Sequence, residues 1–383
     1  MAGLAPAIHV FLGGKTQGSA LHPPGPAALD CGRFFYIIKA ICSHSWVNKM
    51  DVSSEFSQEQ INLAVFLEGI FMPLTARERA EAVGRSKVDG EDGGYLRFSH
   101  YTAASSGLNI INKKRFWMRN AVCMSDYSEI EYGHGVLLEY FKKDKVAEFD
   151  AALPPCHRGV FLEVIEMFNK WWGEIKYNTY ITSVSEHLKS EDRHGRLSMW
   201  RAFGGTSASM AFVFNVPLYS GAAIDLNVLF CPVMYGGGDY YHSSLDAVFA
   251  KIGDNADALS GVDRGIIKNT LFNMLVVGVT CLKHEGFREE REWRIIYFPK
   301  MRPSKFITSE VNDVGGVPQV VHLLPMAEDS PFPMAEHFEK VILGPSPYPW
   351  AMYQAFSDAL TSVGVKDAGG KIVASEIPIR AKF

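Results

Sequence analysis

The sequence lacks the residue spacings that mark several classes of site. Its six cysteines are scattered and none forms a CxxC pair, so we expect reduced, mostly buried thiols in place of a structural zinc site or a disulfide framework. No spacing of histidines and acidic residues suits a metal ion, and none is expected. Gly236, Gly237 and Gly238 lack the Lys-Ser/Thr of a phosphate-binding P-loop and are expected to form a flexible turn.

Long apolar runs and dense basic stripes are also missing. No segment reaches the ~18 apolar residues of a transmembrane helix. The apolar run at residues 34–42 is too short to span a membrane and lies too far along the chain for an ordinary signal peptide. The formal net charge is -4, with 38 basic and 42 acidic residues, which disfavours a dedicated nucleic-acid binder. We therefore expect a cytoplasmic protein without a membrane partner.

The composition is that of a folded protein, because hydrophobic residues make up 47% and charged residues 21% of the chain. Residues 1–49 begin with a stretch rich in Gly, Pro and Ala and are predicted to be disordered. Residues 50–94 are predicted to form a helical lead-in and a polar linker, with Met50 nearer the natural start. Residues 95–383 are expected to form a single α+β domain.

Strand and helix patterns are interspersed from residue 95 onward without strict alternation, which favours an α+β or mixed domain over a doubly wound parallel sheet. Period-2 patterns predict strands over 95–101, 116–118, 180–185, 211–216, 223–235 (with a break at Pro232), 292–298, 320–324, 340–343 and 375–379. Period-3.6 patterns predict helices over 105–113 (capped by Ser105 or Ser106), 131–150, 158–174, 197–203, 245–250, 266–282 and 350–363.

His100 stands at a predicted strand end with hydroxyl side chains as neighbours. A histidine there can donate a hydrogen bond to a ligand hydroxyl or transfer a proton; the alternative is a structural histidine bonded to a nearby carbonyl. Asp126 is predicted to cap the next helix, with Glu129 completing a capping box, and the alternative is a polar loop at the rim of a pocket.

Ser183 and Ser185 are predicted to project from one face of their strand, because side chains alternate. Two small hydroxyl residues leave room for a flat ligand and can bond its amide; the alternative is an ordinary half-exposed strand. Arg201, on the next predicted helix, can meet a phosphate through two hydrogen bonds or pair with an acid.

The densest charge cluster covers residues 283–294. Such a run is usually a solvated loop. Glu290 and Glu292, however, are two apart at a predicted strand start, so we expect them to project to the same side. Paired carboxylates in one site can divide their roles, one orienting a sugar hydroxyl or stabilising positive charge and the other taking a proton. Arg294 is expected to continue this face and to lower their pKa values or to hold a phosphate.

Five ordered segments over roughly residues 95–347 resemble the bacterial domain of unknown function 2971. They are LRFSHYT, SGLNIINKKRFWMRNAVCMSDYSEIEYG, YITSVSE with LSMWRAFGG, FREEREWRI and VILGPSP. One departure is Ser125 before Asp126, where the family usually has Asn. Residues 1–90 lie outside the resemblance, which by itself implies no activity.

The strand with His-Tyr-Thr and the short helix with GLxII after it also resemble the start of ADP-ribosyltransferase domains. That resemblance implies a mixed, largely antiparallel sheet with flanking helices, NAD as substrate and no metal. It implies Glu292 as the catalytic carboxylate, supported by Glu290. The implied NAD-binding residues are His100 at the ribose, Ser183 and Ser185 at the nicotinamide, Tyr101 stacked on its ring, neighbouring Thr102, and Arg97 or Arg201 at the pyrophosphate.

Three functions follow as expectations. The first is NAD-dependent ADP-ribosyl transfer to a protein, nucleic-acid or small-molecule acceptor, in the role of a toxin or phage-defence effector. The second is a module that senses a nucleotide or binds a partner without turnover. The third is a hydrolase, such as an NAD glycohydrolase or a phosphodiesterase. Because Glu290 and Glu292 are both present, an enzyme is favoured over a sensor.

Overall fold

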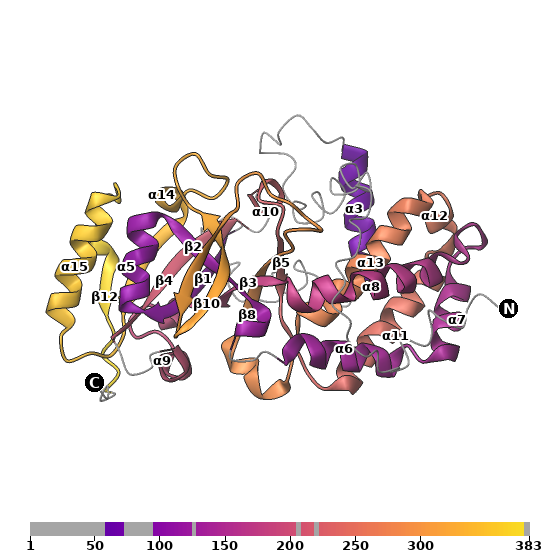
Figure 1. Ribbon diagram of the computed structural model, residues 1–383, viewed down its shortest axis with the longest axis horizontal. Helices are drawn as coiled ribbons and strands as arrows, with labels where there is room; N and C mark the ends of the chain where they lie inside the picture. Colours follow the sequence, from indigo (N-terminus) through magenta and orange to yellow (C-terminus); the bar gives the residue numbers. More distant parts are fainter. Residues whose placement is uncertain (1–57, 73–94, 125–127, 204–207, 218–221, 379–383) are drawn as a thin grey trace. The chain divides into compact units, whose positions relative to one another are not determined.

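A computed structural model describes residues 58–72, 95–124, 128–203, 208–217 and 222–378 (Figure 1). The chain divides into two compact units, each built from three segments. We call residues 1–78, 125–178 and 234–285 the helical unit, and residues 79–124, 179–233 and 286–383 the sheet unit. The expected single domain over 95–383 concerns which part of the chain folds on its own. This division into units does not test that, so the single domain stays a prediction. Residues 1–49, the linker and Asp126 lie outside the described residues.

The helical unit surrounds one almost wholly buried helix, α13, which packs against α8 and α6. Its described elements are α3 (Gln58–Phe71), α6 (Glu129–Tyr140), α7 (Lys143–Ala152), η2 (Pro155–His157), α8 (Val160–Tyr177), β6 (Met234–Tyr235), α11 (Gly238–Asp254), α12 (Ala256–Ser260), α13 (Arg264–Thr280) and β7 (Leu282–Lys283). β6 and β7 form a short parallel pair. Among the described residues, no helix is long and apolar enough to cross a membrane.

The sheet unit contains a sheet of ten described strands. They are β1 (Tyr95–Ala103), β2 (Arg115–Asn120), β3 (Tyr180–Glu186), β4 (Ser209–Pro217), β5 (Leu229–Pro232), β8 (Glu292–Tyr297), β9 (Thr308–Val314), β10 (Val317–Pro325), β11 (Phe338–Leu343) and β12 (Ile372–Ala374). Their order along the main path is β12-β11-β4-β1-β3-β2-β10-β9, and β8 joins β3 to β5. Within this sheet the β11–β12 pairing is parallel and the others are antiparallel, which confirms a mixed, largely antiparallel sheet.

Helices cover both faces of this sheet. The longer ones are α5 (Ala104–Lys113), α9 (Leu197–Phe203) and α15 (Pro349–Ser362), with shorter turns at α10 (Ala222–Asp225), α14 (Met334–His337), η1 (Ala121–Cys123), η3 (Lys189–Glu191), η4 (Glu285–Glu290) and η5 (Gly369–Lys371). α5 and α15 share a core with Phe212 and Phe214 of β4. On the other face, Trp200 of α9 packs on Tyr101 and Val213. We call these the α5/α15 face and the α9 face.

One edge of β3 changes partner partway along. β1 pairs with it at two positions, ending at Ser99 opposite Ser185. β2 takes the same edge at Ile181 and Tyr180. Residues 182–184 therefore lie between the two ladders, in what we call the β3 fork. This is the feature of the fold that positions the candidate site.

Several predicted elements were wrong in type or extent. The strand over 223–235 begins as helix α10 and turns at Asn227, whose φ of 57° is tolerated by asparagine better than by most residues. β5 then ends at Pro232, as expected. The last strand is β12, which ends before the predicted range 375–379, and Ser375 there donates its hydroxyl to the His194 carbonyl. The polar strand β9 was missed.

Three helical predictions need correction. The helix predicted over 245–250 is only the middle of α11, which begins at Gly238, so Gly238 does not belong to the expected flexible turn. The helix over 131–150 is two helices, because Phe141 leaves the first one and is buried against Phe149 and Phe161, so that packing overrides helix propensity. The predicted serine cap of α5 is wrong, because the helix begins one residue earlier and its cap, Ala103, makes no side-chain hydrogen bond.

Candidate functional site

Glu292 is the first residue of β8 and is 6% exposed. Its carboxylate oxygen Oε1 accepts a hydrogen bond from Ser183 Oγ at 2.5 Å and from Arg294 Nε at 2.9 Å. Arg294 Nη2 also donates to Oε2 at 3.2 Å. Since β3 and β8 pair with Ser183 opposite Arg294, alternation brings all three side chains to one face. The predicted shared face of Ser183 with Ser185 is therefore present, as is that of Glu292 with Arg294, and the pairing of β3 with β8 brings the two pairs to the same side.

Glu290 does not share this geometry. It ends η4 and does not belong to β8, and Arg291 between the two acids has a φ of 45°. Strand alternation therefore does not apply to the pair, and the expectation that Glu290 and Glu292 project together because they are two apart in a strand was wrong. What Glu290 contributes in this structure is its carbonyl, which accepts a hydrogen bond from Ser185 Oγ.

His100 lies in the β3 fork. Its Nδ1 is 3.0 Å from the Ser183 carbonyl oxygen. Because a carbonyl oxygen only accepts, Nδ1 carries the proton. If the β1–β3 ladder continued beyond Ser99, Tyr101 would lie opposite Ser183. The ladder ends at Ser99, and the His100 imidazole takes the place of a backbone N–H as the donor to the Ser183 carbonyl. Burial lowers the pKa of His100, and the bond to Ser183 only partly offsets this. The ring is therefore neutral at pH 7, with Nε2 as an acceptor.

His100 and Glu292 project from opposite faces of the sheet. His100 pairs with Phe212 and contacts Phe116 edge to face, which places it on the α5/α15 face. Glu292 pairs with Ser185 on the α9 face. Ser183 joins the two, its carbonyl accepting from His100 and its hydroxyl donating to Glu292. Both His100 and Ser183 are half-buried.

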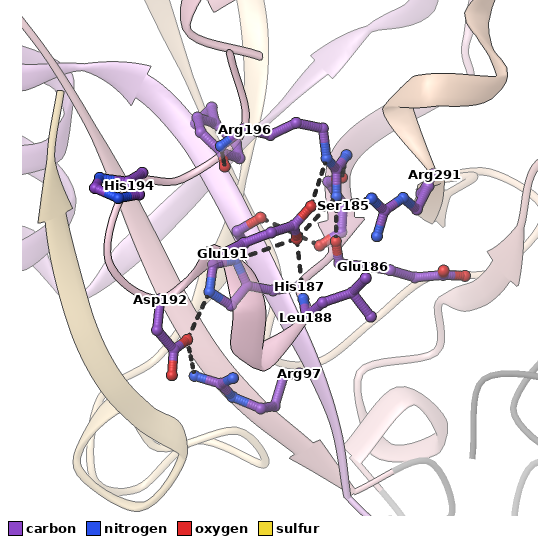
Figure 2. Close-up of polar contacts among 12 residues, drawn as sticks. Arg97, Ser185, Glu186, His187, Leu188, Glu191, Asp192, His194, Arg196 and Arg291 are labelled. Carbon is purple, nitrogen blue, oxygen red and sulfur yellow. Dashed lines mark hydrogen bonds and ion pairs between the residues drawn. The ribbon is translucent and has the colours of Figure 1, made fainter. Parts of the chain in front are cut away.

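Sequence reasoning missed Arg196, the centre of the polar network next to this site (Figure 2). Arg196 is buried, and its guanidinium ties together β3, η3 and the end of η4. It donates to Ser185 Oγ at 2.8 Å, Glu186 O at 2.7 Å, Glu191 Oε1 at 3.0 Å, Glu289 O at 2.9 Å and Glu290 O at 3.1 Å. The Ser185 hydroxyl is thus engaged within the protein, and its predicted contact with a ligand stays a prediction.

The other predicted ligand-binding residues have varied surroundings. Arg97 is buried and donates to Glu339 and to Asp192 Oδ1 at 2.6 Å, so a pyrophosphate there would compete with two carboxylates. Tyr101 is buried, packs against Trp200, and accepts a hydrogen bond from the Arg196 amide through its hydroxyl. Their proposed contacts with NAD stay predictions.

Two further predicted residues, Thr102 and Arg201, lie closer to solvent. Thr102 is half-buried in β1, and Arg201 is exposed on α9. No hydrogen bond or ion pair with another described residue fixes either side chain, and their roles at a ligand stay predictions. Among the described residues, no group of histidine, cysteine and acidic side chains is arranged to hold a metal ion.

The predicted capping box involves Asp126, which lies outside the described residues, so it stays a prediction. The described N-cap of α6 is Ser128, which makes no side-chain cap hydrogen bond, and Glu129 pairs with Lys283 Nζ at 3.1 Å. Beside the Arg196 network, His187 Nε2 lies 2.9 Å from Asp192 Oδ1. Burial and then the charge of Arg97 lower the pKa of His187. The ring is therefore neutral at pH 7 and helps to hold η3 next to β3.

One family model matches this chain, described as a protein of unknown function (DUF2971), over residues 199–295. The match runs from α9 to β8 and includes Glu292 and Arg294 of the candidate site. It supports the resemblance to that family and carries no activity. Comparison with curated proteins and with solved structures gave no significant match.

Proposed function

We propose that the sheet unit catalyses NAD-dependent ADP-ribosyl transfer, with Glu292 as its catalytic carboxylate. The observation that carries the proposal is the contact between Ser183 and Glu292, made where β3 also receives His100. Through its hydroxyl and its carbonyl, Ser183 links a carboxylate on one face of the sheet to a neutral imidazole on the other face. The imidazole, the hydroxyl and the carboxylate are the three groups that the resemblance to ADP-ribosyltransferases implies on a first, a middle and a late strand.

The chemistry suits a carboxylate held in this way. The bond between the ribose C1′ and the nicotinamide nitrogen breaks, and nicotinamide leaves with the electron pair. Positive charge develops on the ribose, and the Glu292 carboxylate stabilises it. The acceptor then forms its bond to C1′ and loses a proton. Ser183 and Arg294 orient the carboxylate through hydrogen bonds, so little reorganisation is needed as the charge develops.

NAD would have to enter the β3 fork, because His100 and Glu292 lie on opposite faces of the sheet. Nε2 of His100 is an acceptor and suits a ribose hydroxyl. The Ser183 hydroxyl donates to Glu292, and its oxygen retains lone pairs for the amide N–H of nicotinamide. The fork thus supplies complementary groups for both the sugar and the base of the substrate.

A second candidate is a module that binds a nucleotide without turnover. The observation that favours it is the burial of Glu292 and Arg294, which are 6% and 3% exposed and neutralise one another. A buried pair of this kind serves specificity or structure in many proteins. An NAD glycohydrolase would use the same groups with water as the acceptor.

The test measures two quantities for the purified full chain: NAD binding by calorimetry, and free nicotinamide after incubation with NAD. Incubation is done with and without a cell extract as a source of protein, nucleic-acid and small-molecule acceptors. Release in either case supports glycosidic chemistry, and dependence on the extract supports transfer over hydrolysis. Binding without release favours the module, and absence of binding contradicts both candidates.

A further inference from the structure

β9 is the last strand on the main path of the sheet and forms a hairpin with β10. The turn consists of Gly315 and Gly316, with φ values of 66° and 83°, as a two-residue hairpin turn requires. Such a turn is closed by a hydrogen-bonded pair, here Val314 opposite Val317. The ladder runs from that pair to Thr308 without a register shift.

This register fixes which backbone groups of β9 face outward. In an antiparallel pair, alternate residues direct their N–H and C=O groups to the partner. Counting from Val314, the even-numbered residues of β9 bond to β10. The odd-numbered residues Ser309, Val311 and Asp313 direct six groups to the open edge. Within the described part of the chain, no other strand pairs with that edge.

Several features that usually prevent edge strands from associating are missing, because β9 has no lysine, no proline and no bulge. Its two acidic residues are Glu310, which pairs with Arg115, and Asp313. Val311 is 72% exposed and Val320, its partner across the hairpin, is 42% exposed. An exposed β-branched pair beside an open edge is suited to receiving another strand.

We propose that β9 pairs antiparallel with β9 of a second copy of this chain, centred on Val311. In this register Val311 faces its counterpart, and Ser309 faces Asp313 on both sides of the two-fold axis. All six outward backbone groups are then paired across the interface. The exposed Val311 side chains meet at the centre, where their burial from water is favourable.

The positions of the two acidic residues of β9 restrict the register in which two copies can pair. Centred on Val311, Glu310 faces Asn312 and Asp313 faces Ser309, so no like charges lie opposite one another. Shifting the pairing by one residue places residues whose backbone groups bond to β10 opposite residues whose backbone groups face the open edge, so these groups do not pair. Shifting by two residues places Glu310 opposite Glu310 in one direction and leaves Ser309 unpaired in the other. A second copy therefore fits this edge best in the one register that satisfies every group.

The interface consists mainly of one strand pair, which is smaller than a typical permanent interface. We therefore expect a concentration-dependent dimer with a dissociation constant on the order of micromolar. Analytical ultracentrifugation of the full chain measures it. Val311→Pro removes an outward N–H and leaves the bonds to β10 intact, so it should abolish the dimer without unfolding the hairpin. Val311→Thr retains the N–H and the β-branched shape, and should remain dimeric.

Cysteine cross-linking tests the register itself. Facing residues of a hydrogen-bonded antiparallel pair have Cα atoms about 5.5 Å apart, within reach of a disulfide. Val311→Cys should therefore form a covalent dimer under mild oxidation. Ser309→Cys should not, because its two copies would lie roughly 14 Å apart along the strands. The parent chain gives the background from its own cysteines.

Several results would overturn the proposal. One is a parent chain that remains monomeric over the concentrations at which micromolar association is visible. Another is a dimer that survives Val311→Pro, or that cross-links equally through Ser309→Cys and Val311→Cys, because it would be held by a different surface or register. Binding of a foreign strand to β9 while the chain alone is monomeric also contradicts it.

Discussion

The Ser183 hydroxyl donates to Glu292 Oε1 over 2.5 Å and so joins the middle of β3 to the start of β8. The same residue accepts a hydrogen bond from His100 through its carbonyl. Ser183 thus contacts both His100 and Glu292, the imidazole and the carboxylate proposed to handle NAD. Variants at these and neighbouring residues separate what such contacts do for a ligand from what they do for the fold.

Replacing His100 tests its role in binding. His100→Asn retains a donor near the position of Nδ1, and therefore the bond to the Ser183 carbonyl, but removes Nε2. We expect NAD affinity to fall about tenfold, the equivalent of roughly one hydrogen bond, with little change in thermal stability. Calorimetry with NAD measures the first and thermal unfolding the second. Unchanged affinity with a large loss of stability would assign His100 a purely structural role.

Arg196 should matter first to stability. Arg196→Lys retains the charge but cannot bond to oxygens on β3, η3 and η4 together, and some buried carbonyls would lose their donor. We expect a loss of roughly 2–4 kcal/mol in the free energy of unfolding. Arg193→Lys is the matched control, because Arg193 is exposed and pairs only with exposed Glu376. It should change stability by less than about 0.5 kcal/mol. Equal effects in urea unfolding would contradict this account.

Two glycines of α6 give an internal comparison in the helical unit. A Cβ on Gly133 would lie 2.7 Å from the Val279 carbonyl oxygen of α13, a backbone atom, whereas a Cβ on Gly135 meets nothing within 4 Å. Gly133→Ala should destabilise by roughly 1–3 kcal/mol. Gly135→Ala should stabilise by about 0.5–1 kcal/mol, because alanine is the better helix former. Urea midpoints of the two variants should move in opposite directions.

His134 should make the helical unit sensitive to acid. Burial, and then the charge of Lys176, lower the pKa of His134 from 6.5 to about 4. Because the folded pKa lies below the unfolded one, stability is complete above about pH 6.5 and is lost as the pH falls toward 4. The slope from this group should be roughly 1 kcal/mol per pH unit. His134→Gln should reduce this slope of stability against pH. The signal of Trp172 can report the unfolding, because its ring stacks on His134. The same slope in His134→Gln as in the parent would refute this; exposed His284→Gln is the control.

Local periodicity predicted much of the sheet unit. The expected bounds of β3, β8 and α9 match the structure closely, because each is a short element with a clear pattern and a polar or glycine boundary. For the same reason the shared face of Ser183 and Ser185 was predictable. β9 was missed because its alternation is carried by polar residues, which a search for apolar periodicity does not detect.

The parts that failed depend on contacts between distant segments. Nothing local marks Arg196, because its partners on β3 and η4 are brought to it by the fold. Likewise, His100 and Glu292 are assigned to opposite faces only once the registers of β1 with β4 and of β3 with β8 are known. The positive φ of Arg291, which removes Glu290 from the strand pattern, is also a tertiary effect.

The most direct test of the account compares two buried carboxylates of one sheet in the nicotinamide-release assay. Glu186 accepts a hydrogen bond from Trp293 Nε1 at 2.9 Å and is the matched control for Glu292. Glu292→Gln should remain folded and release nicotinamide from NAD at least roughly 100-fold more slowly than the parent, while Glu186→Gln should stay within about tenfold. A folded Glu292→Gln variant that releases nicotinamide at the parent rate would contradict the assignment of Glu292 as the catalytic carboxylate.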